Sequence, residues 1–203
     1  ARSKGALMTA SHGMPPLPPV RPLDRTLESV LRARIDGKAK PPGSLGRIED
    51  LAIRLGLIWH PSEPRAGASM LLVFAGDHGL TQEGVSQYPS EVTAAMVRTF
   101  LAGGATANAF AAAAGVDIQV VDMGVAADLP DHPALVRAKV RRGTGNAARE
   151  PAMSPDEAAA ALTRGCDLAV ASVRGGADSV AIGQMGIGNT ASAALLDRKS
   201  TRL

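Results

Sequence analysis

The stretch Val180-Ala-Ile-Gly-Gln-Met-Gly-Ile-Gly-Asn-Thr-Ala-Ser-Ala-Ala-Leu-Leu196 says most about the expected fold. A short apolar run ends in a glycine-rich turn, and a run of small residues with helical character follows. Glycines let a backbone approach a ligand, and the free N–H groups of a first helical turn favour an anion. The pattern predicts a strand, a loop over 183–190 that holds a phosphate, and a helix from Asn189 or Thr190. A tight packing turn without a ligand is the alternative.

Strand and helix patterns alternate from residue 70 onward. Apolar runs predict strands at 70–75, 116–121 and 178–182, and a weaker strand at 135–140. Helical patterns lie between them, over 91–101, 106–114 and 155–175. This alternation predicts an α/β fold, a doubly wound, mostly parallel sheet with helices on both faces.

Local signals place the ends of several helices. Ser90 is the expected N-cap of the helix over 91–101. Ser154 and Glu157 form an expected capping box, with Pro155 at the first helical position. Gly165 is a candidate interruption of the helix that Ser154 begins.

An N-terminal helical segment is expected over residues 23–65, after a disordered lead-in over 1–22 that is rich in proline and small residues. Apolar spacing predicts helices at 24–35 and 47–57. In the second helix, Ile48, Leu51 and Leu55, with Ala52 as a further candidate, share the face expected to be buried.

The remaining boundaries divide the chain after residue 65. Residues 66–196 are the expected nucleotide- and base-binding α/β domain, whose C-terminal part we expect to be missing. Residues 197–203 switch abruptly from a small apolar helix to charge. We interpret them as an artefactual tail, with a solvated helix end as the alternative.

Composition excludes several classes of function. Aromatic residues make up 2% of the chain and the net charge is +3, so we predict no nucleic-acid surface. No apolar run approaches the roughly 20 residues of a membrane span, and the N-terminus lacks the apolar core of a secretory signal. We therefore expect a cytoplasmic protein without a membrane partner.

Cys166, the single cysteine, excludes a disulfide framework and is expected to be a small buried hydrophobe.

Polar residues follow each expected strand. In a parallel sheet the carboxyl ends of the strands meet at one edge, so these residues should share one crevice. They are Asp77, His78 and Glu83 after the first strand, Asp122 after the second, Asn146 after the third, and Gln184, Asn189 and Thr190 after the last.

Asp77 and His78 suit two interpretations. They could line a site as an acid/base pair, or they could cap a loop and hydrogen-bond neighbouring backbone. No second cluster of His, Asp or Glu at ligand spacing accompanies them, so we predict no metal site and no cofactor.

Two segments match the dinucleotide pattern Gly-x-Gly-x-x-Ala, at 143–148 and 186–191. Neither is followed by a strand that ends in an acidic residue about 20 positions on, as a dinucleotide site requires. No Walker lysine follows either loop, and no serine sits in a nucleophile elbow.

Several longer motifs occur together and in a fixed order. They are Lys40-Pro-Pro-Gly-Ser-Leu-Gly-Arg-Ile-Glu49, Ala75-Gly-Asp-His-Gly79 with Glu83-Gly-Val85, Pro89 with Glu91-Val-Thr93, Gly145-Asn146 with Pro151-Ala-Met-Ser154, and Met185-Gly-Ile-Gly-Asn-Thr190. From about residue 24 to 196 the chain resembles the nicotinate-nucleotide–dimethylbenzimidazole phosphoribosyltransferases of cobalamin biosynthesis.

The resemblance implies a reaction. Phosphoribose moves from nicotinate mononucleotide to 5,6-dimethylbenzimidazole, which gives α-ribazole 5′-phosphate and nicotinate with inversion at the anomeric carbon. A ring nitrogen that is cationic in the nucleotide makes nicotinate a good leaving group, so no metal is needed. The family's catalytic base is a glutamate that corresponds to a position beyond Leu203, so we expect no catalytic residue within this chain.

The resemblance also implies site residues and a homodimer for the full-length enzyme. The family commonly has a glutamate where this chain has Gln184, and glutamine cannot act as a base. The implied base-binding residues are Asp77, His78, Tyr88, Pro89, Met96 and Met185. The implied nucleotide-binding residues are Gln184, Gly186, Ile187, Gly188, Asn189 and Thr190.

Three hypotheses follow for this chain. The leading one is an N-terminal fragment of that enzyme with little or no turnover of its own. The second is a nucleotide-binding module without catalysis. The third is a fragment without function, whose exposed sheet edge makes it prone to aggregate.

Overall fold

The structure, a computed structural model, describes residues 19–59 and 67–200. Most of the expected lead-in over 1–22 lies outside these ranges. The chain divides into two compact units, one within residues 16–66 and the other from Gly67 onward. Each unit has a hydrophobic core of its own.

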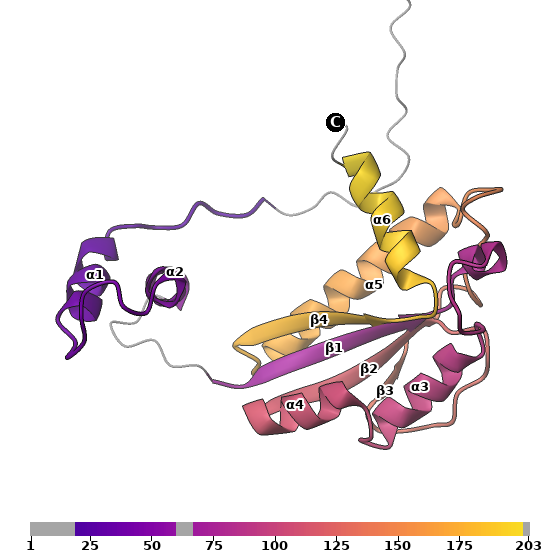
Figure 1. Ribbon diagram of the computed structural model, residues 1–203, viewed down its shortest axis with the longest axis horizontal. Helices are drawn as coiled ribbons and strands as arrows, with labels where there is room; N and C mark the ends of the chain where they lie inside the picture. Colours follow the sequence, from indigo (N-terminus) through magenta and orange to yellow (C-terminus); the bar gives the residue numbers. More distant parts are fainter. Residues whose placement is uncertain (1–18, 60–66, 201–203) are drawn as a thin grey trace, which may run out of the picture. The chain divides into compact units, whose positions relative to one another are not determined.

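A parallel four-stranded sheet forms the centre of the larger unit (Figure 1). Its strands are β1 (Ser69–Gly76), β2 (Val116–Gly124), β3 (Leu135–Arg137) and β4 (Ser179–Met185), in the order β3-β2-β1-β4. β1 pairs with β2 on one side and β4 on the other, which places Leu72 opposite both Gln119 and Ile182. Because all pairings are parallel, the carboxyl ends of the strands meet at one edge.

Helices lie on both faces of this sheet. α3 (Val92–Leu101) and α4 (Thr106–Ala114) lie on one face, and α5 (Pro155–Arg174) runs along the other (Figure 1). A short 3-10 helix, η1 (Gly79–Glu83), follows β1, and α6 (Asn189–Ser200) follows β4. The prediction of a doubly wound α/β fold is confirmed. Within the described ranges, no helix has both the length and the apolar character that crossing a bilayer requires.

The core of the larger unit lies between the sheet and α3. Ala75, Val97, Val120 and Val125 are among its buried members, and Met185 packs against them. In β1 the neighbouring side chains of Leu72 and Val73 are both buried. A strand covered on both faces needs apolar residues at consecutive positions, which explains the continuous apolar run.

Two strands extend further toward the carboxyl edge than predicted. β2 continues to Gly124 and β4 to Met185, where Met185 still pairs with Ala75 of β1. Asp122 and Gln184 therefore lie within strands and not in the loops that follow them. β3 is shorter than predicted and ends at Arg137.

Some local signals for helix ends are confirmed and others are wrong. Ser154 and Glu157 form the capping box that begins α5, with Pro155 in the first turn. The expected interruption at Gly165 is wrong, because α5 is a continuous helix of 20 residues that includes Gly165. Ser90 is not the N-cap of α3. Glu91 holds that position, and the Ser90 hydroxyl donates to Asp77 Oδ1 at 2.8 Å instead.

The smaller unit contains α1 (Glu28–Asp36) and α2 (Arg47–Trp59), which pack through Leu31, Ile53 and Leu57. α1 begins later than predicted because an oxygen of the Asp24 side chain accepts the N–H of Thr26 and holds a turn there. The turn before α2 is held by Lys40 Nζ, which contacts Glu49 Oε1 at 2.7 Å.

The expected buried face of α2 is wrong. Ile48 and Leu51 are exposed, whereas Ile53 and Leu57 are buried against α1. α2 carries apolar residues on two faces, and periodicity alone does not choose between them. Gly56 decides the outcome, because its missing side chain lets Leu31 approach to within 2.8 Å of the place a β-carbon would take.

Cys166 also departs from expectation. Its side chain lies on α5 and is exposed, not buried. α5 has no buried residue, so every position on it retains some contact with solvent.

Candidate functional site

The loops after β1 and β3 interlock at the carboxyl edge of the sheet. The N–H of Thr144 donates to the carbonyl of Asp77 at 3.0 Å, and the N–H of Gly79 donates to the Thr144 hydroxyl at 3.1 Å. Gly79 also passes directly against the backbone of Gly145. The Gly143-Thr-Gly-Asn146 segment is therefore a packing partner of the β1 loop.

His78 connects the β1 loop to β4 and α6. Its Nε2 lies 3.0 Å from Gln184 Nε2, and its Nδ1 lies 3.0 Å from the hydroxyl of Ser192. The side-chain oxygen of Gln184 in turn accepts from Asn189 at 2.5 Å. Burial lowers the pKa of His78, and the negative charge of Asp77 acts in the opposite direction.

The glycine loop between β4 and α6 sits tightly against its surroundings. A β-carbon on Gly186 would lie 2.1 Å from the carbonyl oxygen of Gly76. Gly188 has φ +85°, a conformation that favours glycine. The N–H of Ile187 donates to Thr93 Oγ1 at 3.1 Å, which ties the loop to α3. Both glycines have structural reasons to be glycine, whether or not the loop holds a ligand.

α6 begins at Asn189, directly after this loop. The first turn of a helix leaves N–H groups without partners in the helix, and these groups and the helix dipole favour an anion. Thr190 is exposed at the start of this turn. The N–H groups of Ile187 and Asn189 already donate to Thr93 and Gly186, and the phosphate cradle over 183–190 stays a prediction.

A pocket of about 180 Å³ opens beside these loops. It lies at the carboxyl ends of β1, β2 and β4 and reaches α5. Its lining includes Asp77, His78, Gln184, Thr144, Arg141 and Met153. Arg141, which donates to Glu157 Oε2 at 3.1 Å, is a cation at this edge that sequence reasoning missed.

Asp77 is buried, and both oxygens of its carboxylate are occupied. Oδ1 accepts the Ser90 hydroxyl, and Oδ2 accepts the N–H of Ala126 at 2.7 Å. The carboxylate therefore fixes the start of α3 and the loop after β2. Of the two interpretations of Asp77, these contacts support the structural one.

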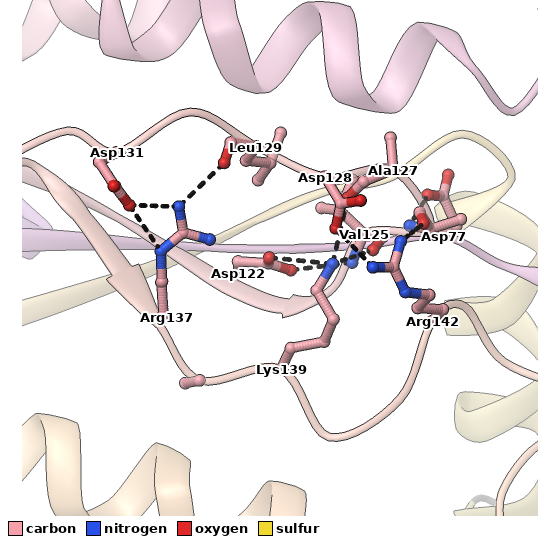
Figure 2. A network of polar contacts seen from close by, with 12 residues as sticks. Asp77, Asp122, Val125, Ala127, Asp128, Leu129, Asp131, Arg137, Lys139 and Arg142 are labelled. Carbon is pink, nitrogen blue, oxygen red and sulfur yellow. Dashed lines mark hydrogen bonds and ion pairs between the residues drawn. The ribbon is translucent and has the colours of Figure 1, made fainter.

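Asp122, within β2, is held in a second network of polar contacts with the loop after that strand (Figure 2). Its side chain is 1% exposed, accepts the N–H of Val125 and lies 3.2 Å from Lys139 Nζ. Lys139 also donates to the carbonyls of Val125 and Ala127. Figure 2 shows this lysine reaching across to the loop over 125–131, so that Asp122 is part of the scaffold.

Glu83 joins η1 to the loop after β3. Its Oε1 accepts from Asn146 at 2.6 Å and from Arg149 at 2.8 Å. The hydrogen bond from Asn146 and then that from Arg149 lower the pKa of the Glu83 carboxyl. Asn146, which is buried, thus positions a loop. Among the described residues, no cluster of three or more His, Cys, Asp or Glu side chains is placed to hold a metal ion.

Comparison with known proteins identifies the family. Residues 20–203 match a family described as phosphoribosyltransferase. The nicotinate-nucleotide–dimethylbenzimidazole phosphoribosyltransferase of Cupriavidus taiwanensis is 47% identical over 186 residues, which are 92% of this chain and 54% of that protein. The protein of the same name from Geobacter sulfurreducens is 48% identical over 86% of this chain and 50% of its own length.

The chain belongs to this phosphoribosyltransferase family.

A solved member of the family has the same fold. The nicotinate-nucleotide–dimethylbenzimidazole phosphoribosyltransferase of Thermus thermophilus superposes with a TM-score of 0.80 at 47% identity, over 84% of this chain and 52% of that one. The chain thus spans about half the length of the curated relatives it matches.

The residues expected to bind the base do not all lie in the pocket at the carboxyl edge. Asp77 and His78 line the pocket at the carboxyl edge, with Gln184. Met185 points to the opposite face of β4 and packs against the core under α3. Tyr88, Pro89 and Met96 are not among the lining residues of that pocket, and the Tyr88 side chain is 65% exposed.

Several residues at the carboxyl edge gave no recognisable signal in the sequence. Thr93, Thr144 and Ser192 each supply a hydroxyl that orders a loop or His78. Single threonines and serines in helices and loops are common. Only their position next to the carboxyl edge distinguishes these three.

Proposed function

We propose that this chain forms the nucleotide- and base-binding part of a nicotinate-nucleotide–dimethylbenzimidazole phosphoribosyltransferase. The observation that carries the proposal is the 47% identity to relatives of that name over 92% of the chain. The reaction transfers phosphoribose from nicotinate mononucleotide to 5,6-dimethylbenzimidazole in cobalamin biosynthesis. Its products are α-ribazole 5′-phosphate and nicotinate.

The phosphate is assigned to the loop between β4 and α6, from Gly186 to Thr190. The N–H groups of Thr190 and Ala191 in the first turn of α6 and the Thr190 hydroxyl are suitable donors to a phosphate dianion, whereas the N–H groups of Asn189 and Ser192 donate to the carbonyls of Gly186 and Gly188. The pocket lined by His78 and Gln184 lies at the start of this loop and is assigned to the rings of the substrates. Asp77 is assigned a supporting position behind His78. Tyr88, Pro89, Met96 and Met185 remain proposals as base contacts.

We assign no catalytic role to Gln184, because an amide cannot act as a general base, and we propose that the family's catalytic glutamate has no counterpart in this chain. The chain spans about half the length of the curated relatives it matches, which supports this proposal. We further propose that the whole enzyme is a homodimer that acts in the cytoplasm on small molecules, without a nucleic-acid partner. The exposed free thiol of Cys166 suits a reducing compartment.

Calorimetric titration with nicotinate mononucleotide, together with an assay for α-ribazole 5′-phosphate, tests this proposal. We expect the 203-residue chain to bind the nucleotide with little or no product. Thr190→Val should weaken binding, whereas Thr163→Val, which changes an exposed threonine on α5, should not. Failure to bind the nucleotide, or robust turnover by this chain alone, would contradict the proposal. Binding that persists unchanged in Thr190→Val would move the phosphate to another loop.

A further inference from the structure

Four polar side chains at the carboxyl edge form one continuous hydrogen-bonded chain. Asn189 Nδ2 donates to Gln184 Oε1 at 2.5 Å, Gln184 Nε2 lies 3.0 Å from His78 Nε2, and His78 Nδ1 lies 3.0 Å from Ser192 Oγ. The four residues come from β4, α6 and the loop after β1. Such a chain has a direction, because some of its groups can only donate and others can only accept.

The direction is set at Gln184. Its amide oxygen is occupied by the donor of Asn189, so its amide nitrogen is the atom that faces His78. An amide nitrogen donates and does not accept, and therefore His78 Nε2 must be the acceptor. An imidazole that accepts at Nε2 is neutral and carries its proton on Nδ1. That proton is then donated to the hydroxyl of Ser192.

The surroundings of the ring agree with a neutral histidine. Asp77 is a carboxylate whose charge acts on the ring, and its two oxygens already accept from Ser90 and Ala126. The cation on the pocket wall is Arg141, which is paired with Glu157. The groups that contact the ring from β4 and α6 are the uncharged Gln184 and Ser192. Burial of the ring also lowers the pKa of His78.

We propose that Gln184 is a positioning residue that holds His78 as the neutral tautomer, with its proton on Nδ1 and its Nε2 lone pair directed at the Gln184 amide at the pocket wall. The consequence of this tautomer for ligand binding rests on the proposed function. A neutral His78 does not repel the cationic pyridinium ring of nicotinate mononucleotide. Its Nε2 also becomes a free acceptor for a ligand N–H or O–H that displaces the Gln184 amide. A carboxylate at position 184 would reverse this, because it would stabilise the imidazolium.

Nitrogen-15 NMR of the imidazole rings in the ligand-free 203-residue chain tests the tautomer directly. The His78 signals are identified by their loss in His78→Phe. We expect a protonated Nδ1 and an unprotonated Nε2 at neutral pH. In Gln184→Glu we expect proton binding by His78 to become tighter by about tenfold or more, because an adjacent carboxylate favours the charged ring. Gln82→Glu adds the same charge on exposed η1 as the matched control and should cause a much smaller change.

A proton on Nε2 in the wild-type chain would overturn the inference, even where Gln184→Glu fails to fold. So would a Gln184→Glu effect no larger than that of Gln82→Glu. Both measurements are made without substrate. The inference therefore stands or falls separately from nucleotide binding, and a chain that binds no nucleotide still reports the tautomer of His78.

Discussion

Gly79 and Gly145 are in backbone contact, although they lie on different loops. A β-carbon on Gly79 would stand 2.6 Å from the carbonyl carbon of Gly145 and 2.6 Å from the carbonyl oxygen of Thr144. The two loops are also tied by hydrogen bonds through Thr144. The site is therefore built on two loops that touch without intervening side chains, and its geometry depends on a glycine at residue 79.

Gly79→Ala is expected to destabilise the larger unit by about 1–3 kcal/mol or more, since backbone atoms cannot move aside as a flexible side chain can. Urea unfolding followed by circular dichroism measures the loss. Gly104→Ala is the control, because its β-carbon would meet the Thr99 methyl group at an ordinary 3.5 Å. Equal stability of the two variants would show that the loops separate easily.

Gly165→Ala is expected to stabilise the protein by about 0.5–1 kcal/mol. Gly165 lies inside α5, and no atom from outside the neighbouring helix backbone lies within 4 Å of its absent β-carbon, so alanine gains helix propensity without a clash. Gly56→Ala, inside α2, is the matched comparison and should bring no gain, because Leu31 occupies that space. A loss of stability in Gly165→Ala would contradict a continuous α5.

Lys139→Met is expected to cost about 1–3 kcal/mol. It removes the cation 3.2 Å from Asp122, whose carboxylate is 1% exposed and would lose that partner. Arg137→Met is the control, because Arg137 contacts the same loop but pairs with the exposed Asp131, and should cost about 1 kcal/mol or less. Similar losses in the two variants would mean that the Asp122 carboxylate finds another partner.

Stability is expected to fall as the pH drops below about 6.5, the ordinary pKa of histidine. Because burial lowers the pKa of His78 in the folded protein, the unfolded chain binds more protons between that folded value and 6.5. The contribution is fully present above the unfolded pKa and is lost as the pH falls toward the folded one. Urea unfolding of wild type and His78→Asn across this range measures the effect. If the stability of His78→Asn changed with pH as steeply as that of the wild type, the pH dependence would belong to other groups.

Much of the fold could be predicted because its signals are local. The capping box at Ser154, the helix over 106–114 and the apolar run of β1 each involve residues that are neighbours in the sequence. Parallel topology then places the loops after β1 and β4 at one edge, which brought His78, Gln184 and Asn189 together as expected. Element boundaries were predicted less accurately, and the extra length of β4 moved Gln184 into the strand.

The alternation of strands and helices can be predicted from the order of apolar and polar residues, and with it the edge of the sheet where the polar residues gather. The partner that each of these residues takes depends on packing in three dimensions. Ser90 is bonded to Asp77 instead of capping a helix, Met185 faces the core, and α2 buries Ile53 rather than Ile48. The physical reason is the same in each case. Each side chain contacts the groups that packing brings close to it, and those groups come from segments that are far apart in the chain.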